Sequence, residues 1–287
     1  MKRFLTTFLI VLSVLCGFAE NRALLVGIGR YKVGTGWSTI HGDADVDLLS
    51  MALKKKGYGD IIILKNNQAI KSDIVNALKT LAERCKSGDK VYFHFSGHGQ
   101  PMTDLNGDEG EKGFDESIVP YDAYKLVTSR NGKEFYNGEN HLSDDELNPL
   151  FAAIKGKIGK DGQLFIAVDA CFSEDIQRAP GSEEAGLPPT RGTSDRLNIR
   201  KTSFLIPRPK SYPPGAKMFV VSACKSDERN FEYRASDGKL YGSLTYFIFT
   251  QLATSTDFEK WCKNLQSNTG TNRIFQTFQH PQIKIIK

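Results

Sequence analysis

Short apolar runs alternate with amphipathic stretches along most of the chain. The continuous apolar runs predict strands that are covered on both faces, and the amphipathic stretches predict helices with one buried side. This alternation favours an α/β fold, with a mostly parallel central sheet of about six strands flanked by helices on both faces. The predicted strands are 23–28, 61–64, 90–95, 163–168, 218–223 and 282–286, and the predicted helices are 43–56, 72–85, 143–155, 243–252 and 258–265.

Two stretches interrupt the alternation. Residues 97–138 are polar and rich in glycine, which predicts mainly loop, and residues 173–217 combine proline, glycine and scattered charge, which predicts a long exposed linker. Between them, Ser143 precedes a helical pattern with Glu146 three residues later. That spacing predicts a capping box, and Gly156 is expected to end the helix.

The first 19 residues have the pattern of a secretory signal. A short basic start is followed by the apolar run 4–18 and by small residues up to Ala19. We expect cleavage after Ala19 and export to the periplasm or beyond the cell. A retained membrane anchor is the alternative, but the run is shorter than the roughly 20 residues that span a bilayer. A lipid anchor on Cys16 is disfavoured because a bulky leucine precedes it.

Composition narrows the class of protein. The chain has 287 residues, of which 40% are hydrophobic and 25% charged, as in ordinary globular proteins. The formal net charge of +5 is spread along the chain, so we expect no nucleic-acid partner and, after signal removal, no membrane partner. Four cysteines remain after export and allow two disulfides, or at most one if one cysteine is catalytic: Cys85, Cys171, Cys224 and Cys262. No cysteine–histidine cluster has zinc-site spacing.

Two predicted strand ends carry the candidate chemistry. The third strand runs into Ser96-Gly97-His98-Gly99, and the fourth runs into Asp169-Ala170-Cys171. Ligands bind beyond the carboxyl ends of parallel strands, where this histidine and cysteine can face each other. An imidazole near a thiol favours the nucleophilic thiolate, so the pair suits nucleophilic catalysis. Either residue alone is more often a surface histidine or a core cysteine.

The sequence resembles the caspase-like cysteine peptidases, and most closely the metacaspases and bacterial orthocaspases of peptidase family C14. SGHG is followed about 70 residues later by DACFS, and four further segments match: ALLVGIGRYK, GDADVDLL, GFDESIVPYD and VVSACKSDE. The resemblance extends from about Asn21 to Leu252. It implies a caspase-like (caspase–hemoglobinase) fold and a cysteine endopeptidase that hydrolyses peptide bonds after Arg or Lys. Together with the signal sequence, this predicts a secreted peptidase.

The resemblance also implies roles for individual residues. His98 and Cys171 match the catalytic dyad, and the amides of Gly99 and Cys171 are candidates for the oxyanion site. Asp45, Ser96 and Asp169 match the metacaspase S1 pocket, where carboxylates would pair with a cationic P1 side chain. Metacaspases often carry a cysteine where this chain has Gly42, so the match is incomplete. Alternatively, Asp45 serves the helix start and Asp169 accepts loop N–H groups.

A calcium site is a further expectation of the resemblance. Asp115, Asp144 and Asp145 match acids that bind Ca²⁺ in similar metacaspases, and carboxylate oxygens suit this ion. The fourth family acid corresponds to Arg178, for which Asp175 is a possible substitute. Alternatively, the two adjacent acids only favour the start of their helix. The chemistry itself requires no cofactor. The residues 104–108 resemble a calcium loop without completing an EF-hand.

Self-cleavage within the linker is expected if the peptidase prefers Arg or Lys. The candidate positions are Arg178, Arg191, Arg196, Arg200 and Lys201. Cleavage would separate a large-subunit-like part, 20–175, from a small-subunit-like part, 217–287, across the linker 176–216. The alternative is an insertion that is never cut. By resemblance, we expect a monomer acting on polypeptide substrates.

Three other readings compete with a metacaspase-like peptidase. A catalytically silent caspase-like domain would bind a partner, although both His98 and Cys171 are present. A relative such as clostripain, gingipain or legumain would share the dyad and differ in linker and specificity. A nucleotide-binding protein is rejected, because the glycines at 27 and 29 lack a third glycine at the required spacing.

Overall fold

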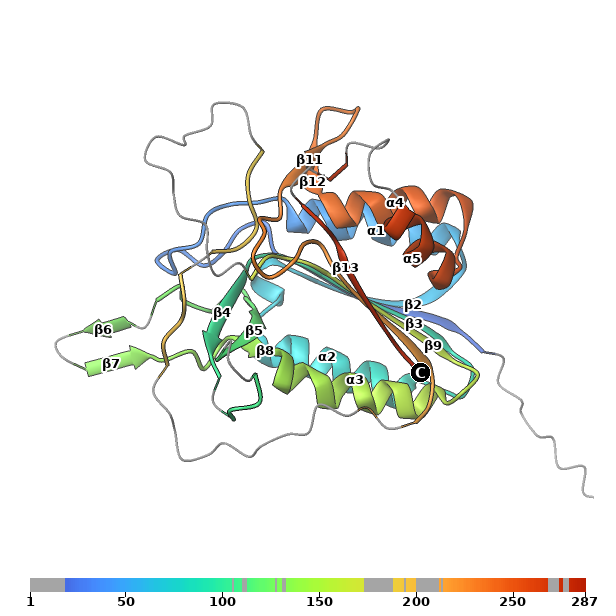
Figure 1. Cartoon of the computed structure of the whole chain (residues 1–287), viewed down its shortest axis with the longest axis horizontal. Helices are drawn as coiled ribbons and strands as arrows, with labels where there is room; N and C mark the ends of the chain where they lie inside the picture. The colour runs from blue at the N-terminus through green and yellow to red at the C-terminus, as the bar shows by residue number, and fades with distance from the viewer. Residues whose placement is uncertain are drawn as a thin grey trace, which may run out of the picture.

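A six-stranded sheet forms the centre of the protein (Figure 1). The computed structural model describes residues 19–104, 106–109, 113–126, 128–130, 133–172, 188–193, 195–199, 212, 214–267, 274–275 and 279–287. The sheet order is β13 (Gln282–Ile286), β10 (Lys217–Ser222), β9 (Gln163–Asp169), β3 (Lys90–Ser96), β1 (Asn21–Gly27) and β2 (Tyr58–Lys65). All neighbours pair in parallel except the edge strand β13, which is antiparallel to β10. The predicted mostly parallel sheet is confirmed.

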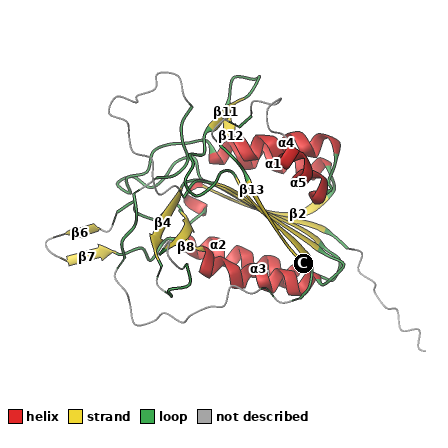
Figure 2. Ribbon diagram, viewed as in Figure 1, coloured by secondary structure: helices red, strands yellow, loops and turns green. Residues whose placement is uncertain are grey.

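Helices cover both faces of the sheet (Figures 1 and 2). One face carries α1 (Gly42–Lys55), α4 (Ser243–Thr254) and α5 (Phe258–Ser267), and the other carries α2 (Lys71–Arg84) and α3 (Asp144–Ile158). A short 3-10 helix, η1 (Asn66–Gln68), follows β2. The amphipathic stretches therefore predict these helices to within a few residues. Among the described residues, no helix is long and apolar enough to cross a membrane.

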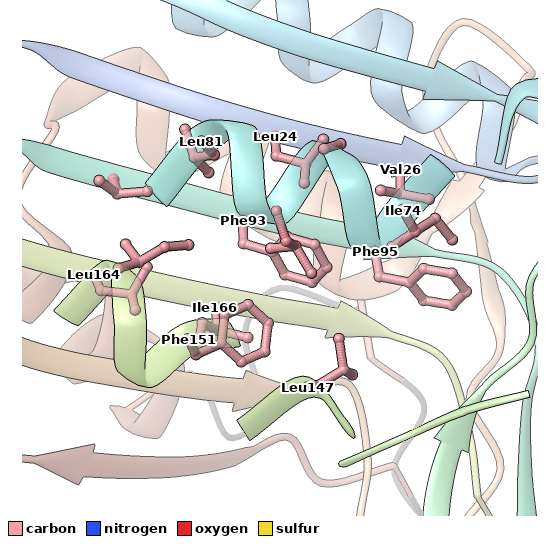
Figure 3. Packing of buried hydrophobic residues seen from close by; sticks show 14 of the residues in the cluster. Leu24, Val26, Ile74, Leu81, Phe93, Phe95, Leu147, Phe151, Leu164 and Ile166 are labelled. Atoms are coloured by element: carbon pink, nitrogen blue, oxygen red, sulfur yellow. The ribbon is translucent and has the colours of Figure 1, made fainter. Parts of the chain in front are cut away.

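The α2 and α3 face is held by large apolar side chains (Figure 3). Phe93 of β3 meets Phe151 of α3 edge to face, with ring centroids 5.0 Å apart. Both side chains are buried with Leu24, Leu81 and Ile166 in one cluster. Removing an aromatic ring from such a cluster costs about 3–5 kcal/mol, because the lost burial and the cavity add. This packing fixes the strand positions on which the site depends.

The opposite face is more aromatic. Phe165 and Phe219 lie on neighbouring strands, and Phe258 and Trp261 project from α5 onto them. Trp261 is 1% exposed, and its indole N–H donates to the Ser255 carbonyl at 3.1 Å. The polar end of the indole is thus paired while its ring fills the core.

Helix α3 begins as the sequence predicts but ends later. Ser143 and Glu146 form the reciprocal capping box. The helix continues past Gly156 to Ile158, which corrects the predicted end. A single glycine inside a helix costs only about 1 kcal/mol, and the buried side chain of Ile158 compensates. Gly159 ends the helix instead, with a left-handed φ of 64°.

The region 97–138, predicted as mainly loop, contains short strands. β4 (Gly99–Thr103), β5 (Phe114–Ile118) and β8 (Leu142–Ser143) form a small antiparallel sheet, and β6 (Thr128–Arg130) pairs with β7 (Lys133–Tyr136). A further two-stranded sheet joins β11 (Glu232–Arg234) to β12 (Leu240–Gly242). These strands were missed because they are short and mix polar residues and glycine with apolar ones, so they lack the continuous apolar run that marks the central strands.

Candidate active site

The two candidate catalytic residues follow neighbouring strands. β3 and β9 pair in parallel, with Ser96 opposite Asp169 at their carboxyl ends. His98 and Cys171 each lie two residues beyond these ends. The sheet register therefore brings the histidine loop and the cysteine loop to the same edge, as the sequence predicts.

His98 is held in one orientation and one tautomer. Its Nε2 lies 3.0 Å from the Ser38 carbonyl oxygen, to which it donates, so Nδ1 carries the lone pair. Trp37 stacks on the imidazole with centroids 4.9 Å apart, and the Tyr31 hydroxyl accepts the His98 backbone N–H at 2.7 Å. Burial lowers the pKa of His98 to about 4. The ring is therefore neutral at physiological pH and can accept a proton at Nδ1.

Cys171 lies beside a second thiol. Its Sγ donates to the Glu228 carbonyl oxygen at 2.6 Å, and Cys224 Sγ lies 3.5 Å from the same oxygen. A hydrogen bond with Cys171, followed by burial, raises the pKa of Cys224 well above its ordinary value. The four cysteines expected after export are all buried free thiols. Among the described residues, no disulfide constrains the site.

Gly192 lies between the two candidate catalytic residues. Its backbone N–H donates to His98 Nδ1 at 2.9 Å, and it forms a bridge pair with Cys171. A Cβ on this residue would lie 2.2 Å from the Cys171 carbonyl oxygen, and its φ is 133°, so the position requires glycine. A Cβ on Gly99 would lie 2.5 Å from that same oxygen. His98, Gly99 and Cys171, which were predicted for catalysis and for the oxyanion site, therefore all lie close to Gly192 or to the Cys171 carbonyl.

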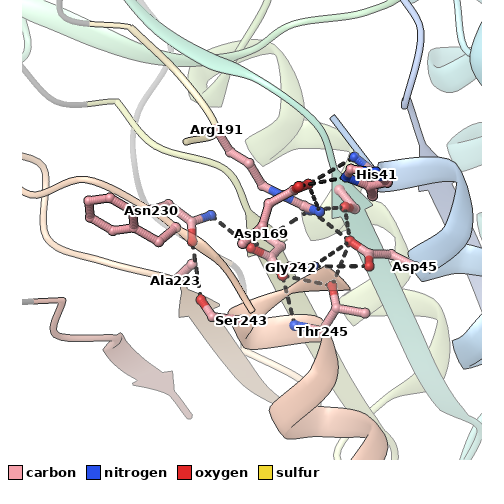
Figure 4. Close-up of polar contacts among 12 residues, drawn as sticks. His41, Asp45, Asp169, Arg191, Ala223, Asn230, Gly242, Ser243 and Thr245 are labelled. Atoms are coloured by element: carbon pink, nitrogen blue, oxygen red, sulfur yellow. Dashed lines mark hydrogen bonds and ion pairs between the residues drawn. The ribbon is translucent and has the colours of Figure 1, made fainter. Parts of the chain in front are cut away.

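The neighbouring residue, Arg191, fills a buried acidic pocket (Figure 4). Its Nη1 donates to Asp45 Oδ2 at 2.7 Å and also contacts the Ser96 hydroxyl. Its Nη2 and Nε donate to Glu232 Oε1 at 2.7 and 3.2 Å. The Arg191 side chain is 0% exposed. Burial alone would lower its pKa, but the surrounding carboxylates outweigh that effect and raise it, so the guanidinium is charged.

The three predicted pocket residues lie together, with different partners. Asp45 accepts the Ser96 hydroxyl at 2.6 Å as well as Arg191. Asp169 lies 4.0 Å from Arg191 Nη1 and accepts the Thr245 N–H and hydroxyl, each at 2.7 Å, and the Asn230 amide at 2.7 Å. Asp169 thus adds negative charge while fixing the pocket wall, so both interpretations of this residue find support.

Gly42 shows how closely the pocket is built. A Cβ there would lie 2.4 Å from the Ser96 carbonyl oxygen and 2.7 Å from that of Ile28. The start of α1 therefore packs directly on the ends of β1 and β3, which places Asp45 in the pocket. Metacaspases often have a cysteine at this position, but here the backbones lie so close that no side chain fits.

The main chain around Arg191 is held by isolated backbone bridges, one of them antiparallel between Thr190 and Phe231. Arg191 N–H donates to the Asn230 carbonyl at 2.9 Å, and Glu232 N–H donates to the Pro189 carbonyl at 2.9 Å. Beyond Gly192, Leu197 N–H donates to the Pro101 carbonyl on β4 at 2.9 Å. An extended peptide held by backbone hydrogen bonds, with one side chain in a pocket, is a general mode of peptide recognition.

This arrangement corrects one prediction. The linker 176–216 was predicted to be exposed. Arg196 and its neighbour Asp195 are exposed, but Arg191 is fully buried and Leu197 is 1% exposed. One or two residues of the segment at a time pair with different elements, so its apolar and polar residues follow no regular period. Among the other candidate cleavage positions, Arg196 is described, with its guanidinium over the Phe114 ring at 3.8 Å. Arg178, Arg200 and Lys201 lie outside the described residues.

Sequence reasoning missed Glu232 and the residue that holds it. Glu232 is 1% exposed; its Oε1 accepts His41 N–H at 2.8 Å, and its Oε2 lies 2.6 Å from His41 Nδ1. The sequence does offer one signal: Glu232 lies between two aromatic residues, Phe231 and Tyr233. Aromatic neighbours indicate a buried segment, and a buried acid needs a specific partner. Its partner lies 191 residues away in sequence, so no local pattern could reveal the contact.

A second acidic cluster lies near β5 and the start of α3. Carboxylate oxygens of Asp104, Asp108 and Asp115 lie within 4.8 Å of one another, as do those of Glu109, Asp115 and Asp144. Burial and the neighbouring carboxylates raise the pKa of Asp144 to about 7. Oxygen donors at this density fit a hard cation such as Ca²⁺.

Two of the three acids predicted to bind calcium therefore belong to these groups. The third, Asp145, lies in neither, but its carboxylate accepts the Asn106 amide from the adjoining loop. Asp175 and Arg178, considered for the fourth position, lie outside the described residues. The loop 104–109 adds acids to the set that the resemblance implies.

The fold and site define a caspase-like α/β protein with histidine and cysteine at adjacent strand ends. Residues 21–180 match the family described as "Metacaspase, peptidase C14 domain". The chain therefore belongs to the metacaspase family, which confirms the resemblance found in the sequence.

Curated relatives agree with this family. Metacaspase-3 of Arabidopsis thaliana is 26% identical over 83% of this chain and 61% of the relative. Metacaspase-2 of the same plant is 30% identical over 79% of this chain and 50% of the relative. The chain thus spans about half to three-fifths of the length of these relatives.

Solved structures agree with the fold. A crystal structure of a Geobacter sulfurreducens protein covers 93% of both chains with a TM-score of 0.61 and 16% identity. Caspase-1 from Spodoptera frugiperda covers 93% of this chain and 88% of its own, with a TM-score of 0.52 and 15% identity. At such identities the likeness concerns the fold alone, and it confirms the predicted caspase-like architecture.

Proposed function

We propose that this protein is a cysteine endopeptidase that cleaves after Arg or Lys, and that its first substrate is its own Arg191–Gly192 bond. One observation carries the proposal. Arg191 occupies the acidic pocket while the Gly192 nitrogen lies 2.9 Å from His98 Nδ1 and Gly192 pairs with Cys171. A basic P1 residue and the leaving-group nitrogen are thus placed as in a bound substrate, and the cysteine that carries the nucleophile lies beside them.

The chemistry follows from these positions. The Cys171 thiol transfers its proton to His98 Nδ1, and its sulfur attacks the Arg191 carbonyl carbon. The amides of Gly99 and Cys171 would stabilise the oxyanion. His98 then gives the proton to the Gly192 nitrogen, the C–N bond breaks, and a thioester with Arg191 remains. Water, deprotonated by His98, hydrolyses the thioester and regenerates the thiol.

The thiol orientation sets a condition on this reaction. In the intact chain, Cys171 Sγ donates to the Glu228 carbonyl. Attack therefore requires the side chain to leave that oxygen and turn toward the Arg191 carbonyl. Ser38, Trp37 and Tyr31 hold His98 and its loop meanwhile. His98 Nδ1 also has to release the Gly192 N–H before it can accept the thiol proton.

The test compares the parent chain with Cys171→Ala and His98→Ala. We expect the parent to hydrolyse fluorogenic amides with P1 Arg or Lys, to leave P1 Asp amides intact, and to be nicked by intact mass. Both variants should stay whole and lose at least a thousandfold in activity. Equal nicking of parent and Cys171→Ala would implicate a contaminating protease. A folded, inactive parent would favour the catalytically silent binding domain.

We also propose that Ca²⁺ binds at the second acidic cluster. Support comes from Asp115 and Asp144, which the family resemblance implies, together with the loop acids within 4.8 Å of them. The bound cation would link Asp104 and Asp108 to Asp115 of β5, next to the β4 strand that contacts Leu197. Activity should rise with added Ca²⁺ and fall in chelator. Undiminished activity in chelator would contradict a calcium requirement.

We further propose that the chain is exported and acts as a monomer. The support for export is the sequence of the first 19 residues, of which 1–18 lie outside the described structure. Expression with its natural start should yield an exported protein that begins at Glu20. Light scattering after size exclusion should give one copy, with the two portions still associated after cleavage. Retention of residues 1–19 in the exported form would contradict signal removal.

A further inference from the structure

The guanidinium of Arg191 is bound on two sides by acids from distant parts of the chain. Asp45 of α1 binds Nη1 at 2.7 Å. Glu232 of β11 binds the other edge, with one oxygen between Nη2 at 2.7 Å and Nε at 3.2 Å. The pocket therefore meets a flat cation along two edges rather than at one point.

Glu232 is fixed by groups other than the bound arginine. Its Oε1 also accepts the His41 backbone N–H, and its Oε2 lies 2.6 Å from His41 Nδ1. The Glu232 side chain is 0% exposed. The backbone N–H of Glu232 itself binds the Pro189 carbonyl. The same residue thus holds the P1 side chain and the main chain of the bound segment at Pro189, two residues before P1.

A lysine cannot make both contacts. Its ammonium is a compact point charge, whereas the guanidinium presents donors along a rigid plane. An ammonium close to Asp45 would leave the Nε edge of the pocket empty and Glu232 without a cation. An ammonium close to Glu232 would leave Asp45 without a cation. A buried carboxylate that loses its cation keeps much of the desolvation penalty of its charge, although neutral donors remain: the His41 N–H for Glu232 and the Ser96 hydroxyl for Asp45.

We propose that Glu232 is a specificity-determining residue that makes this pocket select arginine over lysine at P1. The proposal rests on the proposed peptidase function and narrows its substrate class. Asp45 supplies attraction for any cation, and Glu232 adds recognition of the Nε–Nη2 edge that only arginine offers. When a buried site has two carboxylates that both bind the ligand, a ligand that binds only one of them is disfavoured by about tenfold or more.

The kinetic test uses peptide amides that differ only in P1 Arg or Lys. The parent should show a kcat/KM ratio of about tenfold or more for arginine. Glu232→Gln keeps the side-chain shape, and it should reduce the ratio to about threefold or less, chiefly through loss on the arginine substrate. Asp45→Asn is the matched control, because it should lower both substrates. An equal parent ratio, or an unchanged ratio in Glu232→Gln, would overturn the proposal.

A binding test separates this proposal from the proposed function. Cys171→Ala combined with Arg191→Ala removes the nucleophile and empties the pocket, and calorimetry then measures acetylated peptide amides ending in Arg or Lys. The arginine peptide should bind about tenfold more tightly, and adding Glu232→Gln should remove that preference. If the parent hydrolyses neither substrate, the function fails while this comparison still decides the selectivity. Melting curves verify folding, and Glu232→Asp replaces Glu232→Gln if the latter unfolds.

Discussion

Both acidic clusters of this protein bring carboxylates close together away from water, and they differ in what offsets the repulsion between them. In the pocket, the negative charges of Asp45, Asp169 and Glu232 surround the Arg191 guanidinium. Near β5, Asp144 has a pKa raised to about 7 by burial and by neighbouring carboxylates. The first cluster takes its cation from its own chain, whereas the second has a donor set that suits a cation from solution.

The difference bears on how the pocket of the proposed peptidase would select a substrate. Buried carboxylates are unfavourable without a positive partner, so an empty pocket favours any basic segment that can reach it. In the intact chain that segment is 188–193, held also by the backbone of Asn230 and Glu232. A substrate therefore has to replace this segment, which self-cleavage would release. The following experiments disturb first the pocket and then the second cluster.

Replacing the pocket cation should have the largest effect. Arg191→Ala removes the guanidinium from Asp45 and Glu232 and should slow cleavage at position 191 by about a thousandfold or more, since the site is built to bind that group. It should also lower the free energy of unfolding by about 3 kcal/mol, because buried acids lose their partner. Mass spectrometry and denaturant unfolding measure the two effects.

The matched control for that variant is Arg196→Ala. Arg196 lies in the same segment, but its guanidinium contacts the Phe114 ring rather than the pocket. Cleavage after Arg191 should stay within about twofold of the parent rate. Equal slowing in the two variants would mean that the pocket contact does not select the bond.

The pH dependence of self-cleavage should show two acid steps. Burial raises the pKa of Asp45 to about 6, against the opposing effect of Arg191, so falling pH there weakens the charge that holds P1. Burial lowers the pKa of His98 to about 4, so the base is lost only below that pH. Rates from pH 3.5 to 8 should fall first near 6 and again near 4.

The variant Asp45→Asn assigns these steps. It cannot titrate at position 45, so only the step near pH 4 should remain, on a lower overall rate. A single step near 6.5 in the parent, the ordinary value for histidine, would contradict a buried and neutral His98.

Neutralising the second cluster should have a smaller effect of opposite sign. The pKa of Asp144 in the folded chain lies above its ordinary value of 3.8, so stability is lost as pH rises from about 4 to about 7. Asp144→Asn avoids that loss and should raise the free energy of unfolding by about 2 kcal/mol at pH 8 in chelator, with no gain at pH 4. Urea unfolding measures both values.

Calcium should narrow the difference in the free energy of unfolding between these two proteins at pH 8. The parent should gain about 1.4 kcal/mol at a Ca²⁺ concentration ten times its dissociation constant, and Asp144→Asn should gain less. Equal gains in both proteins would place the ion elsewhere.

The sequence predicts what depends on local periodicity and on strand ends. The six strands of the central sheet and the five helices follow from runs of apolar residues, and His98 and Cys171 follow from their place after β3 and β9. Asp45 and Asp169 required the family resemblance, because an acid near a helix start or strand end has ordinary structural uses.

The contacts that complete the site could not be predicted from the sequence. Arg191 lies 146 residues from Asp45 and 41 from Glu232, and nothing in its own segment distinguishes it from Arg196. Its position depends on backbone pairing with Asn230 and on a glycine that follows it. Such tertiary contacts have no period, so only a three-dimensional structure reveals them.

The most direct test of the central claim is the identity of the first bond cut in the parent chain. Intact mass and amino-terminal sequencing of the products, taken at the earliest detectable nicking, should give a small portion that begins at Gly192 and a large portion that ends at Arg191. A first product that begins after another basic residue, with Arg191–Gly192 still whole, would contradict the claim that this peptide lies in the site as a substrate.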